Sequence, residues 1–158
     1  MLLAQQAVEE LKLAHERFNR STGCLTEAHS GFLPAEGSMT VAQQVAHAAR
    51  VIDWLFEGAF RREGFDMNFE EQIKEVTAIN SLAKARTWFD KAVAKGIAIL
   101  AQQSDASLLA LLPEGPVMGG MPRMAIISAA VDHTAHHRGA LTIYSRMNRL
   151  IPPDPFGM

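Results

Sequence analysis

Apolar side chains recur every three or four residues through four long segments of this chain, and this spacing constrains the fold more than any other feature. The period is that of an α-helix, so each segment presents an apolar stripe that must be buried against another element. The segments span approximately residues 2–20, 40–61, 80–103 and 122–148, with a shorter helix expected near 70–76. No segment is convincing as a strand. We therefore expect one all-α domain over residues 1–158, a four-helix bundle with long crossover connections.

Local signals mark the start of two of these helices. Thr40 is a good N-cap, and Gln43 three residues later completes a capping box. Pro122 fits the first turn of the last helix, because an N–H group in that turn has no partner within the helix. We therefore place the second helix after Thr40 and the last helix from Pro122.

Charge and cysteine content narrow the possible partners and compartment. The net charge is -2 and the isoelectric point is about 6.3, which argues against a nucleic-acid-binding protein with a basic face. The N-terminal "MLLAQQAVEELKLAHERF" carries acids and bases every few residues, unlike a signal peptide or a membrane span. The single cysteine, Cys24, excludes an internal disulfide and a four-cysteine zinc site. We expect a cytoplasmic protein that binds neither nucleic acid nor membrane.

The stretch "VDHTAHHRGALTIYSR" places three histidines within the last predicted helix. A helical projection aligns one row of inward-facing residues: Ile126, Ala130, His133, His137, Leu141 and Tyr144. An unpaired buried polar group costs about 1–3 kcal/mol, and two protonated imidazoles side by side would repel each other. Two neutral imidazoles that share one metal ion avoid both costs, and helical zinc sites use the same spacing of four residues. His133 and His137 are therefore candidate metal ligands.

A metal ion needs further ligands. Three other histidines, each on a different segment, are the candidates. His29 lies in a Gly/Ser-containing loop and His15 lies off the apolar stripe of the first helix, so we expect both to be solvated. His47 borders the apolar stripe of the second helix and can face a cleft between helices. The commoner role of a single buried histidine is a hydrogen bond to a carbonyl group, and both interpretations stay open on these observations.

Two segments resemble the signatures of the DinB/YfiT-like metalloenzyme family. "HTAHHRGALTIYSRMNRLIPP" is similar to the H-x-x-x-H-R-G segment and proline-rich exit of its last helix, and "TVAQQVAHAARVIDWL" is similar to its second helix. The resemblance implies an up-down-down-up four-helix bundle, often a homodimer, in which His47, His133 and His137 hold a divalent metal ion. Ala140 stands where the family frequently has glutamine.

Three histidine ligands would leave coordination positions open for water or substrate, as in catalytic metal sites. Imidazole ligands alone do not select one metal. We expect zinc or nickel, with iron as a third candidate. Relatives of the family that use a low-molecular-weight thiol suggest an S-transferase or a hydrolase with a small-molecule substrate. Tyr144 could bind that substrate or be a core aromatic, and Arg138 could anchor an anion or pair with Asp132 or Glu27. The alternative is a non-catalytic dimer that binds a metal or a small ligand, as a sensor or stress protein does.

Overall fold

The computed structural model describes residues 2–157, and these residues form helices joined by loops. The elements are α1 (Leu2–Thr22), the 3-10 helix η1 (Glu27–His29), α2 (Val41–Phe60), α3 (Phe69–Thr77), α4 (Leu82–Ala101), α5 (Asp105–Leu109) and α6 (Ala125–Met147). Within residues 2–157 the only β-type pairing is an isolated bridge between Leu111 and Pro122. The predicted all-α class is confirmed. None of the described helices is long and apolar enough to cross a lipid bilayer.

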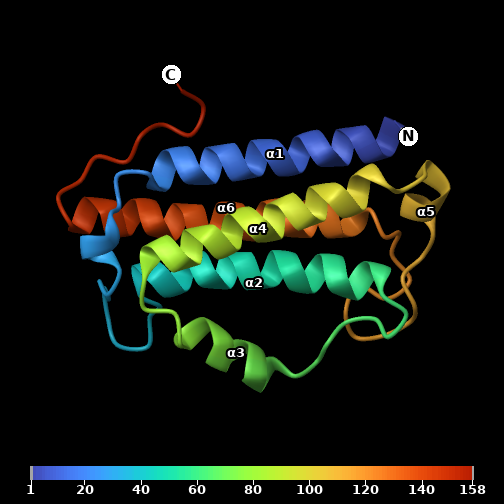
Figure 1. Ribbon diagram of the computed structural model, residues 1–158, viewed down its shortest axis with the longest axis horizontal. Helices are drawn as coiled ribbons and strands as arrows, with labels where there is room; N and C mark the ends of the chain where they lie inside the picture. Colours follow the sequence, from blue (N-terminus) through green and yellow to red (C-terminus); the bar gives the residue numbers. More distant parts are fainter. Residues whose placement is uncertain (1, 158) are drawn as a thin grey trace.

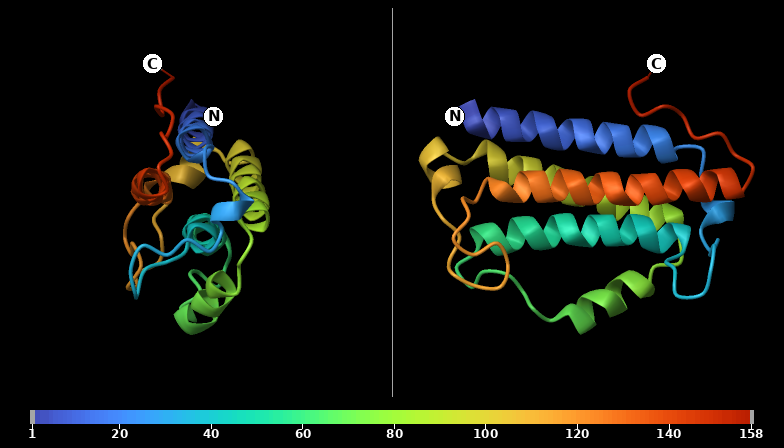
Figure 2. Two further views of the ribbon diagram at one scale, coloured as in Figure 1. Left: turned by 90° about the vertical axis from the view of Figure 1, so that its left-hand side faces the viewer. Right: turned by 180° about the vertical axis from the view of Figure 1, so that it is seen from behind.

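The four long helices α1, α2, α4 and α6 lie side by side (Figure 1; Figure 2 shows them end-on at the left). Both α1 and α2 pack against α4 and α6, so each long helix has two long neighbours. In Figure 1 α1 and α6 run in one direction, while α2 and α4 run in the other. The segment from α2 to α4, which includes α3, therefore crosses the full length of the molecule. The connection from α1 to α2 stays at one end of the bundle, and the connection from α4 to α6 stays at the other.

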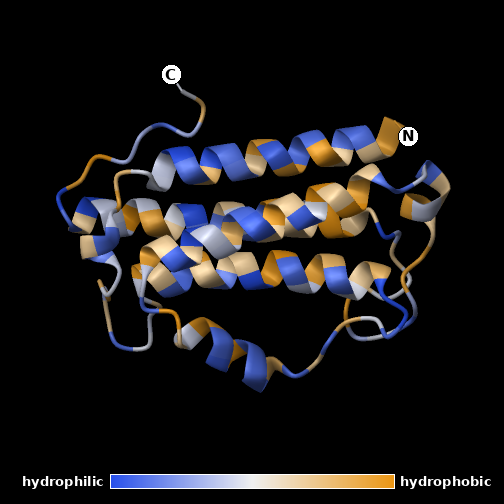
Figure 3. Cartoon of the chain, viewed as in Figure 1, coloured by the Kyte–Doolittle hydropathy of each residue, from blue (hydrophilic) through white to orange (hydrophobic). Residues whose placement is uncertain are grey.

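The apolar stripes of the long helices meet in one core. Figure 3 shows apolar residues recurring along each long helix between polar ones. Aromatic rings fill the centre: the side chains of Phe18 and Phe89 are fully buried, with ring centroids 4.4 Å apart. Phe56 of α2 belongs to the same cluster. This core fixes how α2 and α6 face each other, and thereby where their polar side chains meet.

The predicted capping box at the start of α2 is present. The Thr40 hydroxyl accepts a hydrogen bond from the Gln43 amide nitrogen at 3.2 Å, and the Gln43 side chain accepts one from the Thr40 amide at 3.0 Å. The helix starts at Val41, as the spacing of these two residues indicates. The box satisfies two N–H groups that would otherwise lack partners.

The start of the last helix differs from the prediction, because α6 begins at Ala125 and not at Pro122. The backbone just before α6 is hydrogen-bonded to the segment around the end of α5. The Arg123 and Met124 amides donate to the carbonyls of Ala110 and Leu108, at 2.9 Å and 3.0 Å. Arg123 and Met124 form a turn held by these bonds, and the regular helix starts at the next residue, Ala125.

Candidate metal centre

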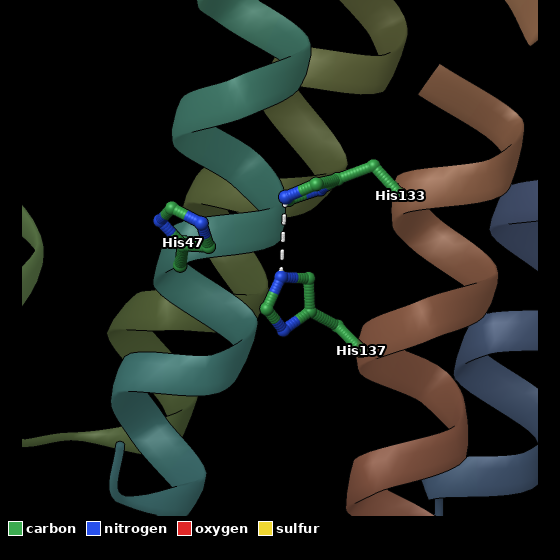
Figure 4. A group of neighbouring side chains, drawn as sticks. All are labelled: His47, His133 and His137. Carbon is green, nitrogen blue, oxygen red and sulfur yellow. Dashed lines mark hydrogen bonds between the residues drawn. The ribbon is translucent and has the colours of Figure 1, made fainter. Parts of the chain in front are cut away.

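Two helices supply three histidines that converge on one point (Figure 4). His47 projects from α2, and His133 and His137 project from α6, one turn apart. Each offers a ring nitrogen, and these nitrogens all lie within 4.8 Å of one another. The centroid of the His47 ring is 5.1 Å from that of His133 and 5.0 Å from that of His137. The two α6 histidines therefore point toward a neighbouring helix, as predicted.

The spacing of the two α6 nitrogens fits a divalent ion. The Nε2 atoms of His133 and His137 are 3.2 Å apart. Two ligands of a tetrahedral zinc ion, each at about 2.0–2.1 Å from the metal, are separated by about 3.3 Å. The group contains no carboxylate and no thiolate, so an ion held here would have imidazole ligands only. Such a set suits zinc, nickel, copper or iron.

Burial keeps these imidazoles in the neutral form that binds metal. The pKa of His137 is lowered to about 3, mainly by burial and in smaller part by the neighbouring His133, His47 and His136. The pKa of His133 falls to about 4 for the same main reason. Burial also lowers the pKa of His47, with a contribution from His136. At neutral pH all three rings therefore carry a free lone pair.

The other three histidines have different surroundings. His136 is exposed, with its ring edge-on to His137 at a centroid distance of 5.0 Å. His15 was expected to be solvated but is partly buried, and its Nε2 lies 2.6 Å from Asp90. His29, also expected to be solvated, is partly buried and accepts a hydrogen bond from the Thr26 amide. The structure therefore groups only His47 with the α6 pair.

Gln44 is a contact of the site that the sequence prediction missed. Its buried side chain extends from α2, and its Oε1 is hydrogen-bonded to Nδ1 of His137. Its Nε2 donates to the Tyr144 hydroxyl at 3.1 Å, and that hydroxyl donates to the Met39 carbonyl at 3.1 Å. The Tyr144 hydroxyl is thus engaged within the protein, and its role toward a substrate stays a prediction. The signal for Gln44 was its position three residues before His47, on the same side of a helix.

Arg138 lies beside a second cation. The pKa of its guanidinium is lowered by partial burial and by the nearby Arg17 of α1. Among residues 2–157 no ion pair joins Arg138 to Asp132 or Glu27, and the Glu27 carboxylate instead accepts from the Ala83 amide at 2.8 Å. Of the two roles expected for Arg138, the one as an anion anchor stays a prediction.

Comparison with known proteins places the chain in a family. The family model described as the DinB superfamily matches residues 10–141, most of the sequence. The chain belongs to the DinB superfamily. A crystal structure of a DinB-like protein from Bacillus cereus ATCC 10987 is similar with a TM-score of 0.75 and 18% sequence identity, covering 94% of this chain and 95% of that one. A conserved protein from Enterococcus faecalis is similar with a TM-score of 0.57 and 21% identity, covering 90% and 94%. No curated protein matches the sequence significantly.

These two likenesses concern the fold, and the match to the DinB superfamily confirms the family that the two sequence segments resemble. His47, His133 and His137 all fall within the matched residues. The matched range therefore contains all three histidines that the coordinates bring together.

The buried histidines predict how the stability of the metal-free DinB-superfamily chain depends on pH. His133 and His137 have an ordinary pKa of 6.5 when unfolded, and of about 4 and 3 when folded. Below pH 6.5 the unfolded chain therefore binds protons that the folded chain does not, and the free energy of unfolding decreases as the pH falls. We expect a decline between pH 6.5 and 4.5 in urea titrations. His133→Leu should make the decline shallower, with the contribution of His137 left, and an unchanged slope would contradict the burial of a neutral imidazole at this position.

Proposed function

We propose that this DinB-superfamily protein is a metal-dependent enzyme in which His47, His133 and His137 bind one divalent ion. The observation that carries the proposal is the convergence of three ring nitrogens from α2 and α6 within 4.8 Å of one another. We take zinc or nickel as the preferred ion and iron as the third candidate; imidazole ligands suit each of these metals. The three neutral rings need lose no proton at neutral pH before they bind.

Three protein ligands leave at least one coordination position open, which is the arrangement of catalytic sites and not of closed structural ones. When bound, the ion would supply Lewis acidity, which lowers the pKa of a coordinated water or thiol. The chain itself holds the ligand rings: the core packs α2 against α6, and burial of His137 keeps bulk water from one side of the site.

The proposed reaction is transfer to or from a low-molecular-weight thiol, or hydrolysis of a small molecule. Arg138 and Tyr144 are the weaker candidates for contact with that substrate. The guanidinium of Arg138 is free of any acidic partner among the described residues and could hold a carboxylate of the thiol. The Tyr144 hydroxyl would have to give up its bond to the Met39 carbonyl before it could bind substrate.

The test is turnover by the metal-loaded protein. Glutathione, bacillithiol and mycothiol are offered in turn, with monochlorobimane as a generic electrophile, after loading with zinc or with nickel. We expect metal-dependent turnover that His137→Ala abolishes, and that His29→Ala preserves because His29 lies outside the site. Stoichiometric metal binding without turnover on any of these thiols would favour a non-catalytic binding protein instead.

We also propose a homodimer in the cytoplasm. The family resemblance supports the dimer, and α6 carries the apolar side chains of Ile143 and Met147, which are more than half exposed. Cys24 is a free thiol, as is usual in a reducing compartment. Light scattering coupled to size-exclusion chromatography would give twice the chain mass for a dimer and the chain mass for a monomer.

A further inference from the structure

The side-chain amide of Gln44 lies between α2 and α6, directly behind one of the three histidines. Gln44 precedes His47 by three residues, so both side chains extend from the same side of α2 toward α6. Only 8% of Gln44 is exposed. A buried amide without hydrogen bonds would be costly, and here both ends of the amide are bonded to residues of α6.

The direction of this hydrogen-bond chain follows from its last member. The Met39 carbonyl oxygen can only accept, so the Tyr144 hydroxyl donates its proton there. The hydroxyl oxygen then accepts from Nε2 of Gln44, at 3.1 Å. This assigns the amide: its Oε1 faces His137, and because Oε1 can only accept, Nδ1 of His137 must carry the proton.

The opposite orientation of the amide leaves groups unpaired. If Oε1 faced Tyr144, the amide NH₂ would donate to Nδ1 of His137, and the proton of that imidazole would move to Nε2. The Tyr144 hydroxyl would then donate either to Oε1 or to the Met39 carbonyl and leave the other without its donor. One orientation satisfies every member of the chain, and it is the one in the structure.

We infer that Gln44 is a positioning residue that holds His137 in the tautomer with its proton on Nδ1, and so directs a bare Nε2 at the metal position. The purpose of this arrangement rests on the proposed function, whereas the tautomer itself is a property of the metal-free protein. The usual partner for the outer nitrogen of a metal-binding histidine is a carboxylate, a carbonyl or water, and the amide oxygen of Gln44 takes that place.

His133 differs from His137 in this respect. Its Nδ1 atom is buried and has no hydrogen-bond partner among the described residues. Its Nε2 atom lies 3.2 Å from Nε2 of His137, which is bare in the inferred tautomer and can only accept. In the metal-free protein His133 therefore carries its proton on Nε2 and donates it to His137. A metal ion held by Nε2 of both rings would require the other tautomer of His133 and would leave that of His137 as it was.

The test reads the tautomers directly, by nitrogen-15 NMR of the metal-free protein with labelled histidine at pH 7.5. We expect His137 in the Nδ1–H form in the wild type, and a loss of that preference in Gln44→Leu. Gln44→Glu should retain the Nδ1–H form, because a carboxylate oxygen accepts from Nδ1 of His137 as the amide oxygen does. Zinc affinity, measured by competition with a chelator, should fall about 10–100-fold in Gln44→Leu and recover in Gln44→Glu.

Gln72→Leu is the matched control, since it removes another buried amide, whose Nε2 donates to the Asp66 carbonyl at 3.1 Å, away from the histidines. It should leave the tautomers and the zinc affinity unchanged. Tyr144→Phe, which removes the group that orients the Gln44 amide, provides the same readout if Gln44→Leu fails to fold. His137 in the Nε2–H form, or tautomers that neither variant changes, would overturn the inference. A wild type that binds none of zinc, nickel and iron but shows the Nδ1–H form would refute the proposed function alone.

Discussion

Replacing His47 with alanine is expected to reduce the bound metal from roughly one ion per chain to a trace. His47 is the member of the histidine group that α2 contributes, and without it only the pair on α6 is left. Substitutions that merely disturb the orientation of a ligand cost about 10–100-fold in affinity, so loss of a ligand should cost more than about 100-fold. The measurement is elemental analysis of the purified protein after reconstitution with zinc or nickel and removal of free ions.

His15→Ala serves as the control for this experiment. It also removes an imidazole from the chain, but His15 is hydrogen-bonded to Asp90 and belongs to α1. The control should bind as much metal as the wild type. Equal metal content in wild type and His47→Ala would exclude His47 as a ligand, and a wild type without metal after reconstitution would exclude the whole centre.

Phe89→Ala should lower the free energy of unfolding by about 3–5 kcal/mol, the usual cost when a large buried aromatic is truncated. Phe89 is fully buried on α4, and its ring lies 4.4 Å from that of Phe18 on α1. Neither helix contributes a metal ligand, so the loss should appear in the metal-free protein. Urea denaturation followed by circular dichroism measures it.

Phe156→Ala is the comparison for that variant. Phe156 is 60% exposed, and the centroid of its ring lies 4.9 Å from Cζ of the Arg17 guanidinium. We expect a change below about 1 kcal/mol, because an exposed cation–π contact contributes little. If both variants lost equally little stability, the aromatic cluster would not be the centre of the core.

The helices could be predicted where an apolar stripe repeats over several turns, and the short helix expected near 70–76 is present as α3. The five-residue helix α5 is too short to show a period, and its main local signal is the Ser104 hydroxyl, which accepts from the Ser107 amide at 3.1 Å. The true start of α6 depends on hydrogen bonds to the backbone of residues 108–112, which are contacts between segments and leave no mark in the spacing of residues.

The same limit applies to the candidate site. The common direction of His133 and His137 follows from their spacing on a single helix and could be derived from it. The approach of His47 depends on how α2 packs against α6, so it rested on a family resemblance. The role of Gln44 depends on that packing too, because both partners of its amide are on α6.

The centre joins residues that are separated by more than half of the chain, since His47 belongs to the second long helix and His133 to the last. A ribosome synthesises a polypeptide from the N-terminus onward at about 5–20 residues per second. During translation the nascent chain would expose His47 well before either α6 histidine emerges. Under the proposed function, zinc or nickel would therefore be bound only after α6 has emerged and packed against α2, so metal capture would follow the pairing of these two helices.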